Sequence, residues 1–140
     1  MLTGDPDLHL VADETILRSE VLGRTHRFRV PHGAVQVRVV SRSAVPAQVR
    51  DDSTDHRRLG VAVSKVVCDG KLIPLTDPCF GSGWREAEYG DGDAAWRWTD
   101  GDAGLAVPGG HVLDIEVAIT GRYWLTEAAA ALDCASAAAA

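Results

Sequence analysis

Aromatic and acidic side chains are concentrated between Gly83 and Gly104, in the stretch GWREAEYGDGDAAWRWTDGDAG. Three of the four tryptophans of the chain lie there. Flat indole rings can stack on the apolar faces of sugars, while nearby carboxylates and arginines can bind the sugar hydroxyls. We therefore expect a saccharide-binding group with these members: Trp84, Glu86, Tyr89, Trp96, Arg97 and Trp98.

Trp96 and Trp98 are two residues apart, so on a strand both rings would leave the same face and Arg97 the other. The alternative is that the tryptophans fill the core of a β protein, each indole N–H bonded to a carbonyl. The sequence favours a loop and a strand whose tryptophans help to close the core, with part of the face left for a saccharide. An exposed pair would favour ligand binding, because large exposed aromatic patches usually bind something.

The sequence Asp-Gly-Asp occurs at residues 91–93 and again at residues 100–102. Calcium takes six to eight oxygen ligands, and glycine lets a chain bend around the ion. Neither copy continues into an EF-hand pattern, and Asp-Gly steps also form ordinary turns. Structural calcium is therefore an alternative to plain turns, and we expect no metal ligands and no cofactor.

Two arginines precede an apolar run in STDHRRLGVAV and follow several aspartates. A guanidinium is a planar fork that matches a carboxylate, so one arginine is expected to bond a carboxylate across the sheet. The other is then available for a ligand anion. We expect Arg57, Arg58, Asp100 and Asp102 to form a polar lock between loop and sheet, with Asp100 paired to one of the arginines.

Few residues of the chain are spaced as a catalytic site requires. Glu86 and Glu88 would share a strand face at a spacing that suits a glycosidase pair, but almost any Glu-x-Glu passes that test. Serine, histidine and aspartate all occur without the Gly-x-Ser-x-Gly elbow of a hydrolase, and no phosphate-binding glycine motif is present. We expect no catalytic residues, and a small carbohydrate hydrolase is the third hypothesis for function.

Apolar and polar residues alternate with a period of two in several segments, which predicts strands. The longest is HVLDIEVAI, and others are HRFRV and AVQVRVVS, in which Val35, Val37 and Val39 share a face. The run LGVAVSKVV, residues 59–67, is apolar throughout and predicts a central strand that is covered on both faces. Shorter strands are expected in DLHLVA and AGLAVP.

Turn residues separate these segments. Asp69-Gly70 is the strongest hairpin signal, because type I′ turns favour Asp-Gly. Pro31-His32-Gly33 and Pro108-Gly109-Gly110 join other strands. The fold predicted is an all-β, antiparallel two-sheet sandwich, jelly-roll-like, with about eight to ten strands over residues 5–125. The alanine-rich residues 126–140 are expected to form a short helix or a disordered tail.

Composition excludes some classes of protein. The chain has 140 residues and a formal net charge of −6, so a nucleic-acid binder is not expected. No run approaches the length of a membrane span, and MLTGDPDLHL is unlike a signal peptide. The location expected is the cytoplasm or export by a signal-independent route. The three cysteines leave open a bridge between Cys68 and Cys79.

Several motifs together resemble a known module. They are, in order, DPDLHLVAD, HRFRVPHGAVQVRVV, DHRRLGVAVSKVVCDG, GSGWREAE, WRWTDGDAGLAVPG and GRYWL. This order is similar to the β-rich region that accompanies Hint (hedgehog/intein-type) domains and surface-polysaccharide glycosyltransferases of alphaproteobacteria. The resemblance implies an accessory β-sandwich and supplies no catalytic residues, because the Hint catalytic core is missing from the chain.

The function expected from these observations is a non-catalytic accessory module that binds a carbohydrate or a cell-surface partner. The alternative is a structural or assembly module of a larger surface or Hint-type protein, in which case an oligomer is expected.

Overall fold

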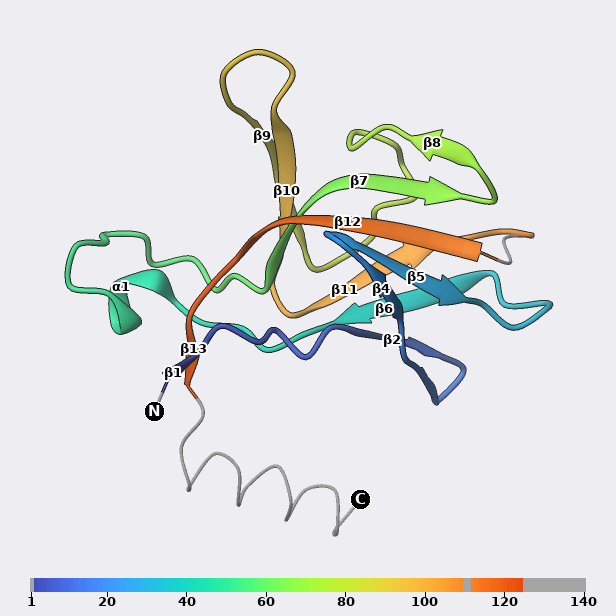
Figure 1. Cartoon of the computed structure of the whole chain (residues 1–140), viewed down its shortest axis with the longest axis horizontal. Helices are drawn as coiled ribbons and strands as arrows, with labels where there is room; N and C mark the ends of the chain where they lie inside the picture. Colours follow the sequence, from blue (N-terminus) through green and yellow to red (C-terminus); the bar gives the residue numbers. More distant parts are fainter. Residues whose placement is uncertain (1, 110–111, 125–140) are drawn as a thin grey trace, which may run out of the picture.

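The computed structural model describes residues 2–109 and 112–124. Within these residues the chain is almost entirely β, with antiparallel sheets packed together as a sandwich (Figure 1). The predicted fold class is confirmed. The expected tail at residues 126–140 lies outside the described residues.

The larger sheet has seven strands. Six follow one another across the sheet, in the order β4 (Glu20–Leu22), β5 (Thr25–Arg29), β12 (Val112–Thr120), β7 (Val61–Cys68), β10 (Ala95–Thr99) and β9 (Trp84–Tyr89). The seventh, β8 (Lys71–Ile73), pairs with the second half of β7, while β10 pairs with the first half. The run predicted as a central strand is thus β7, which has neighbours on both sides.

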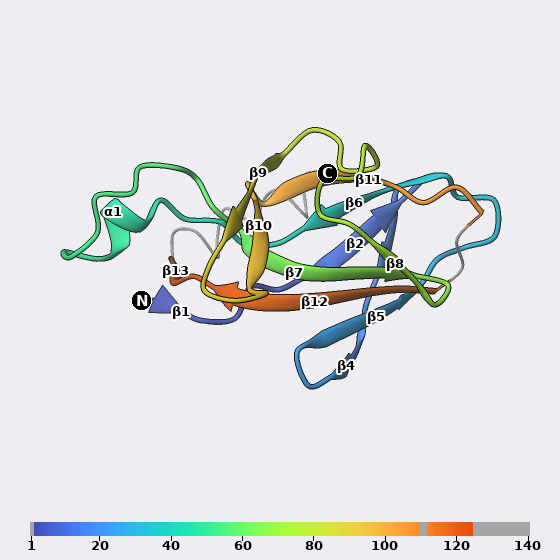
Figure 2. The ribbon, with the colours of Figure 1, turned by 90° about the horizontal axis from the view of Figure 1, so that it is seen from above.

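The smaller sheet has four strands and forms the second layer (Figure 2). Their order is β11 (Asp102–Ala106), β6 (Gln36–Val40), β2 (His9–Ala12) and β3 (Thr15–Leu17). The core lies between the layers and is built from fully buried aliphatic and aromatic side chains of both sheets, among them Leu10, Phe28, Val37, Val63, Leu105 and Ile115.

The alternation of apolar and polar residues correctly predicted most of the buried positions in the longer strands. Leu113, Ile115 and Val117 all point into the core from β12. Ile119, which the alternation places on the same face, is instead 39% exposed, after a register irregularity in the pairing of β12 with β7. Val37 and Val39 do the same from β6, but Val35 is 64% exposed, so the expectation that it shares their face is wrong. The reason is that β6 begins at residue 36, and Val35 lies in the connection that brings the chain from the larger sheet to the smaller one.

The hairpin predicted at Asp69-Gly70 is present between β7 and β8. Both residues have positive φ angles, 50° and 79°, as a type I′ turn requires. Asp69 Oδ1 also accepts the backbone N–H of Val112 at 2.9 Å, which ties this turn to the start of β12.

The structure has more strands than the eight to ten expected, thirteen in the described part of the chain. The tryptophan-rich stretch forms a β9–β10 hairpin rather than a loop and a strand, and this hairpin stands out from the sandwich in Figure 1. The other additional strands are two or three residues long, too short to show a period of two.

The two ends of the described chain lie together. β1 (Leu2–Thr3) pairs with β13 (Tyr123–Trp124) as a separate two-stranded sheet. Tyr123 is fully buried, and its hydroxyl donates to the carbonyl of Gly60 at 2.6 Å and accepts the N–H of Gly121 at 2.9 Å. These bonds fasten β13 to the beginning of β7, next to the loop that carries α1 (Pro46–Val49).

Candidate functional site

Strand β10 sends its side chains to two different environments. Trp96 and Trp98 are on the outer face of the larger sheet, where Trp98 packs with Leu59 and Ala62 in a small apolar cluster of its own. Arg97 points to the opposite face, where its guanidinium donates to the carbonyl oxygens of Arg85 and Leu75, both at 2.6 Å. Arg97 is therefore a structural residue of the inner side and not part of a saccharide group with the two indoles.

Trp84 is partly buried and packs against the main core. Its indole N–H donates to the carbonyl of Gly104 at 2.7 Å, and its ring meets Phe80 edge-on with centroids 4.8 Å apart. Phe80 in turn has the guanidinium of Arg97 over its ring. The aromatic residues predicted as one group are thus divided between the two faces of the sheet, with Trp84 inside and Trp96 and Trp98 outside.

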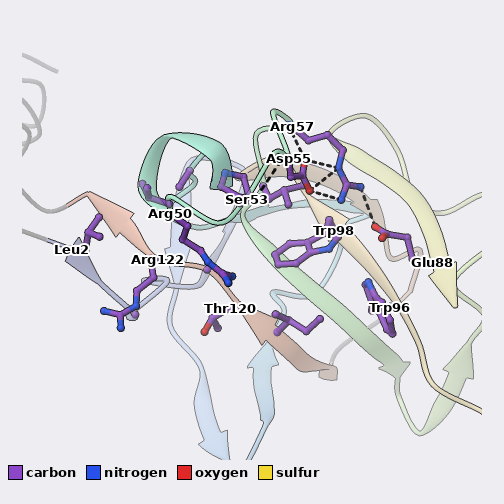
Figure 3. A pocket seen from close by; sticks show the side chains of 17 residues that line it. Leu2, Arg50, Ser53, Asp55, Arg57, Glu88, Trp96, Trp98, Thr120 and Arg122 are labelled. Carbon is purple, nitrogen blue, oxygen red and sulfur yellow. Dashed lines mark hydrogen bonds and ion pairs between the residues drawn. The ribbon is translucent and has the colours of Figure 1, made fainter. Parts of the chain in front are cut away.

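A groove of about 970 Å³ lies over the outer indoles (Figure 3). Trp96 and Trp98 form part of its floor, together with Leu59 and Ile119. One wall is the loop between residues 44 and 59, which carries α1, and the other is the end of β12 with residues 120–122. Trp98 is only 9% exposed, whereas Trp96 is half-buried, so Trp96 is the indole that a ligand can cover.

An ion-pair network closes the β9 end of the groove. Arg57 donates from Nη2 to Asp55 at 2.8 Å and from Nη1 to Glu88 at 3.1 Å (Figure 3). Glu88 lies directly opposite Trp96 in the pairing of β9 with β10. The hydrogen bonds from Arg57 lower the pKa of Asp55 to about 2. The hydrogen bond to Asp55 and, to a smaller extent, the one to Glu88 raise the pKa of Arg57. Asp55 and Arg57 are therefore both charged near neutral pH.

The polar lock expected from the sequence is only partly arranged as predicted. Arg57 bonds a carboxylate on the sheet, but this is Glu88 and not Asp100. Arg58 donates to the hydroxyl of Ser43 at 3.1 Å.

The expected pairing of Asp100 with one of those arginines is wrong. The Oδ1 of Asp100 accepts the N–H of Asp102 at 2.9 Å within a turn, and the carboxylate of Asp102 pairs with Arg38 on the neighbouring strand β6. Both aspartates thus hold the turn into β11 in place.

Besides Trp84 and Arg97, two further residues of the expected saccharide group are outside the groove. Tyr89 is 70% exposed at the end of β9, and Glu86 is an exposed residue of the same strand that does not line the groove. The hydrolase hypothesis needs Glu86 and Glu88 on either side of one bond, and the structure places only Glu88 at the groove, held by Arg57.

Sequence reasoning missed the arginines at the other end of the groove. Arg50 follows α1, and Arg122 precedes β13. Both line the groove (Figure 3). Arg50 comes from a segment without a motif, and the motif GRYWL that contains Arg122 indicates no binding role by itself. Only the folding of the loop at 44–59 against residues 119–122 reveals that both arginines line one hollow.

The calcium site and the disulfide bridge that the sequence left open concern residues outside the groove. Asp91 and Asp93 are exposed at the tip of the β9–β10 hairpin. Among the residues that the structure describes, no group of three or more His, Cys, Asp or Glu side chains is placed to hold a metal ion. Cys68 and Cys79 are free thiols, and burial raises the pKa of each, that of Cys79 to about 11.

Comparisons with protein families, with curated proteins and with solved structures found no match for this chain. The resemblance to Hint-associated modules therefore stays a prediction. No helix in residues 2–109 and 112–124 has the length and apolar character to cross a membrane.

Proposed function

We propose that this chain is a non-catalytic module that binds a saccharide in the groove on the outer face of its larger sheet. The observation that carries the proposal is the position of Trp96, half-exposed on the groove floor with Trp98 packed beside it and with Glu88 opposite in register. An indole gives a flat apolar surface for the C–H face of a sugar ring, and the charged groups beside it can bond the hydroxyls. The volume of the groove and its mostly apolar lining with a few polar groups are typical of a small-molecule site.

The charged groups at the groove support binding rather than hydrolysis. A glycosidase needs one carboxyl group that is protonated near neutral pH, so that it can act as the general acid. Asp55 and Glu88 both accept hydrogen bonds from Arg57, and the pKa of Asp55 is about 2. The ionised carboxylate of Asp55 can accept hydrogen bonds from sugar hydroxyls but is not suited to donate a proton.

The test is a glycan array followed by calorimetry on the sugars that bind, with wild-type protein and with Trp96→Ala. We expect the Trp96→Ala variant to lose binding by about tenfold or more, because a stacked aromatic ring is worth on the order of 1 kcal/mol or more. Tyr89→Ala is the matched control, since Tyr89 is an exposed aromatic residue of the same hairpin outside the groove. Wild-type protein that binds no saccharide at millimolar concentration would refute the proposal.

An assembly module is the second candidate function, and a different observation favours it. β3 and β4 are the end strands of the two sheets, and they expose Ile16 (57%), Val21 (58%) and Leu22 (46%). Unpaired strand edges with apolar side chains can pair with another chain. Light scattering after gel filtration decides this candidate: a stable oligomer that Val21→Lys dissociates supports it, and a monomer at all concentrations contradicts it.

A further inference from the structure

The two ends of the groove differ in charge. At the β9 end the positive charge of Arg57 is matched by two carboxylates, Asp55 and Glu88. At the other end Arg50 and Arg122 lie on the two walls, one after α1 and one before β13 (Figure 3). The groove therefore changes along its length from one arginine held by two carboxylates to two arginines, of which only Arg50 has a carboxylate partner, Asp52, among the described residues.

Arg122 has no carboxylate partner among the described residues, and its side chain is exposed. Arg50 has one partner, Asp52, but both of its hydrogen bonds are 3.2 Å long and the two side chains are 58% and 73% exposed. A pair this exposed contributes little to stability and is easily exchanged for another acceptor. Within residues 2–109 and 112–124, neither guanidinium group is therefore held tightly by a carboxylate, and both can turn to a ligand.

The net charge of the chain is −6, so a groove end with two available arginines contrasts with the rest of the molecule. The field of the acidic molecule acts weakly over distances beyond roughly 8 Å at physiological salt, whereas a guanidinium in contact with a carboxylate is screened much less. The planar fork of arginine also matches the two oxygens of a carboxylate. Contact at this end thus favours an anion that the molecule as a whole would repel.

From this arrangement we infer that the groove selects an acidic saccharide, of the hexuronic acid class, whose carboxylate is held by Arg50 and Arg122 while a neighbouring ring covers Trp96. This inference rests on the proposed function and makes it more specific. The apolar floor accepts the ring, the carboxylates at the β9 end accept hydroxyl hydrogens, and the arginines at the other end take the negative charge.

The experiment compares trigalacturonic acid with its methyl ester, which has the same backbone without the negative charges, by calorimetry. We expect wild-type protein to prefer the acid by about tenfold, and raising NaCl from roughly 50 to 500 mM to reduce this preference. Arg122→Gln should abolish most of the preference, because it weakens binding of the acid much more than binding of the ester. Arg29→Gln, an exposed arginine outside the groove, is the matched control and should keep the preference.

The outcomes distinguish selectivity for acidic saccharides from saccharide binding itself. Equal affinity of wild-type protein for acid and ester, or an unchanged preference in Arg122→Gln, overturns the selectivity for acidic saccharides and leaves saccharide binding intact. Binding of neither trisaccharide overturns the selectivity as well, and the array of neutral glycans then decides the proposed function on its own. If Arg122→Gln fails to fold, Arg50→Gln provides the same comparison.

Discussion

His26 is a partly buried ionisable residue away from the groove. It lies on β5 beside a hollow of about 370 Å³, and its Nδ1 is 3.1 Å from the hydroxyl oxygen of Ser19. Burial lowers the pKa of His26 from its ordinary value of 6.5, because the imidazolium loses hydration when it is enclosed. The neutral ring is therefore the form that the folded protein favours.

The stability of the protein should fall on acidification because of this residue. In the unfolded chain His26 takes up a proton near pH 6.5, and in the folded protein only at a lower pH. The contribution of neutral His26 to the free energy of unfolding is thus fully present above pH 6.5. It is lost as pH falls through the lower pKa of the folded state. Urea denaturation from about pH 7.5 to about pH 5 should show this decline, and His26→Gln should flatten it.

The control for the pH experiment is His56→Gln, at an exposed position in the loop before β7. That variant should keep the slope of the wild-type protein. A decline that survives in His26→Gln would show that another group causes it, and a flat wild-type curve would show that burial of His26 has no effect on proton uptake.

At the scale of single residues, the sequence allowed the faces of a strand to be predicted but not what each face meets. The opposite directions of Trp96 and Arg97 follow from the period of two. Whether the outer face meets solvent, core or a groove depends on the loop at residues 44–59, which folds over Trp98 through Leu59. No local pattern encodes that contact, nor the pairing of Arg57 with Glu88, 31 residues away.

At the scale of elements, the segment before β9 joins the two layers. Gly81 donates its N–H to the carbonyl of Gly104 on β11, and Gly104 donates to Ser82. Gly83 then adopts a φ of +88°, and its carbonyl accepts the N–H of Asp100 at 2.8 Å. A Cβ atom at Gly83 would overlap the carbonyl oxygen of Asp102 and lie 2.7 Å from the Cα of Ala103. The close approach of β9 to β11 thus requires glycine.

Gly83→Ala should destabilise the protein by roughly 3 kcal/mol or more, because alanine is strained at positive φ and its methyl group also meets backbone that cannot move aside. Gly92→Ala is the matched control: Gly92 also has a positive φ, +64°, but no atom lies within 4 Å of its Cβ position. The control should cost only about 1 kcal/mol. Urea denaturation measures both, and equal losses would show that crowding at β11 is unimportant.

Elements with enough residues to show a period were predictable. Half-buried and buried side chains alternate over the first seven of the nine residues of β12, and β7 has a run of apolar residues. β3, β4 and β8 have three residues each, which give no period, and they form only because a longer strand offers them a free edge. α1 has four residues and follows from Pro46 at its beginning together with the path of the loop.

At the scale of the whole molecule, one strand serves both the core and the groove. Val61 and Val63 of β7 point into the core between the sheets, and Ala62 between them supports Trp98 beneath the groove. The groove floor is therefore the reverse side of the sheet that forms the core, and it has no separate set of strands to hold it.

The groove and the core should consequently unfold in one transition. In a variant with Trp84→Phe and Trp124→Phe the two remaining tryptophans, Trp96 and Trp98, both report on the groove. Their fluorescence and the far-ultraviolet circular dichroism of the strands should change at the same urea concentration, as a two-state transition requires.

A core substitution tests the connection directly. Val63→Ala, added to that variant, removes a fully buried side chain that does not touch the groove, at a cost of on the order of 2 kcal/mol. Both signals should move to lower urea by the same amount, because the inner face of β7 cannot loosen while its outer face keeps Trp98 in place. If the circular dichroism moved and the fluorescence did not, the groove cluster would be held by the loop at residues 44–59, independently of the sheet beneath it.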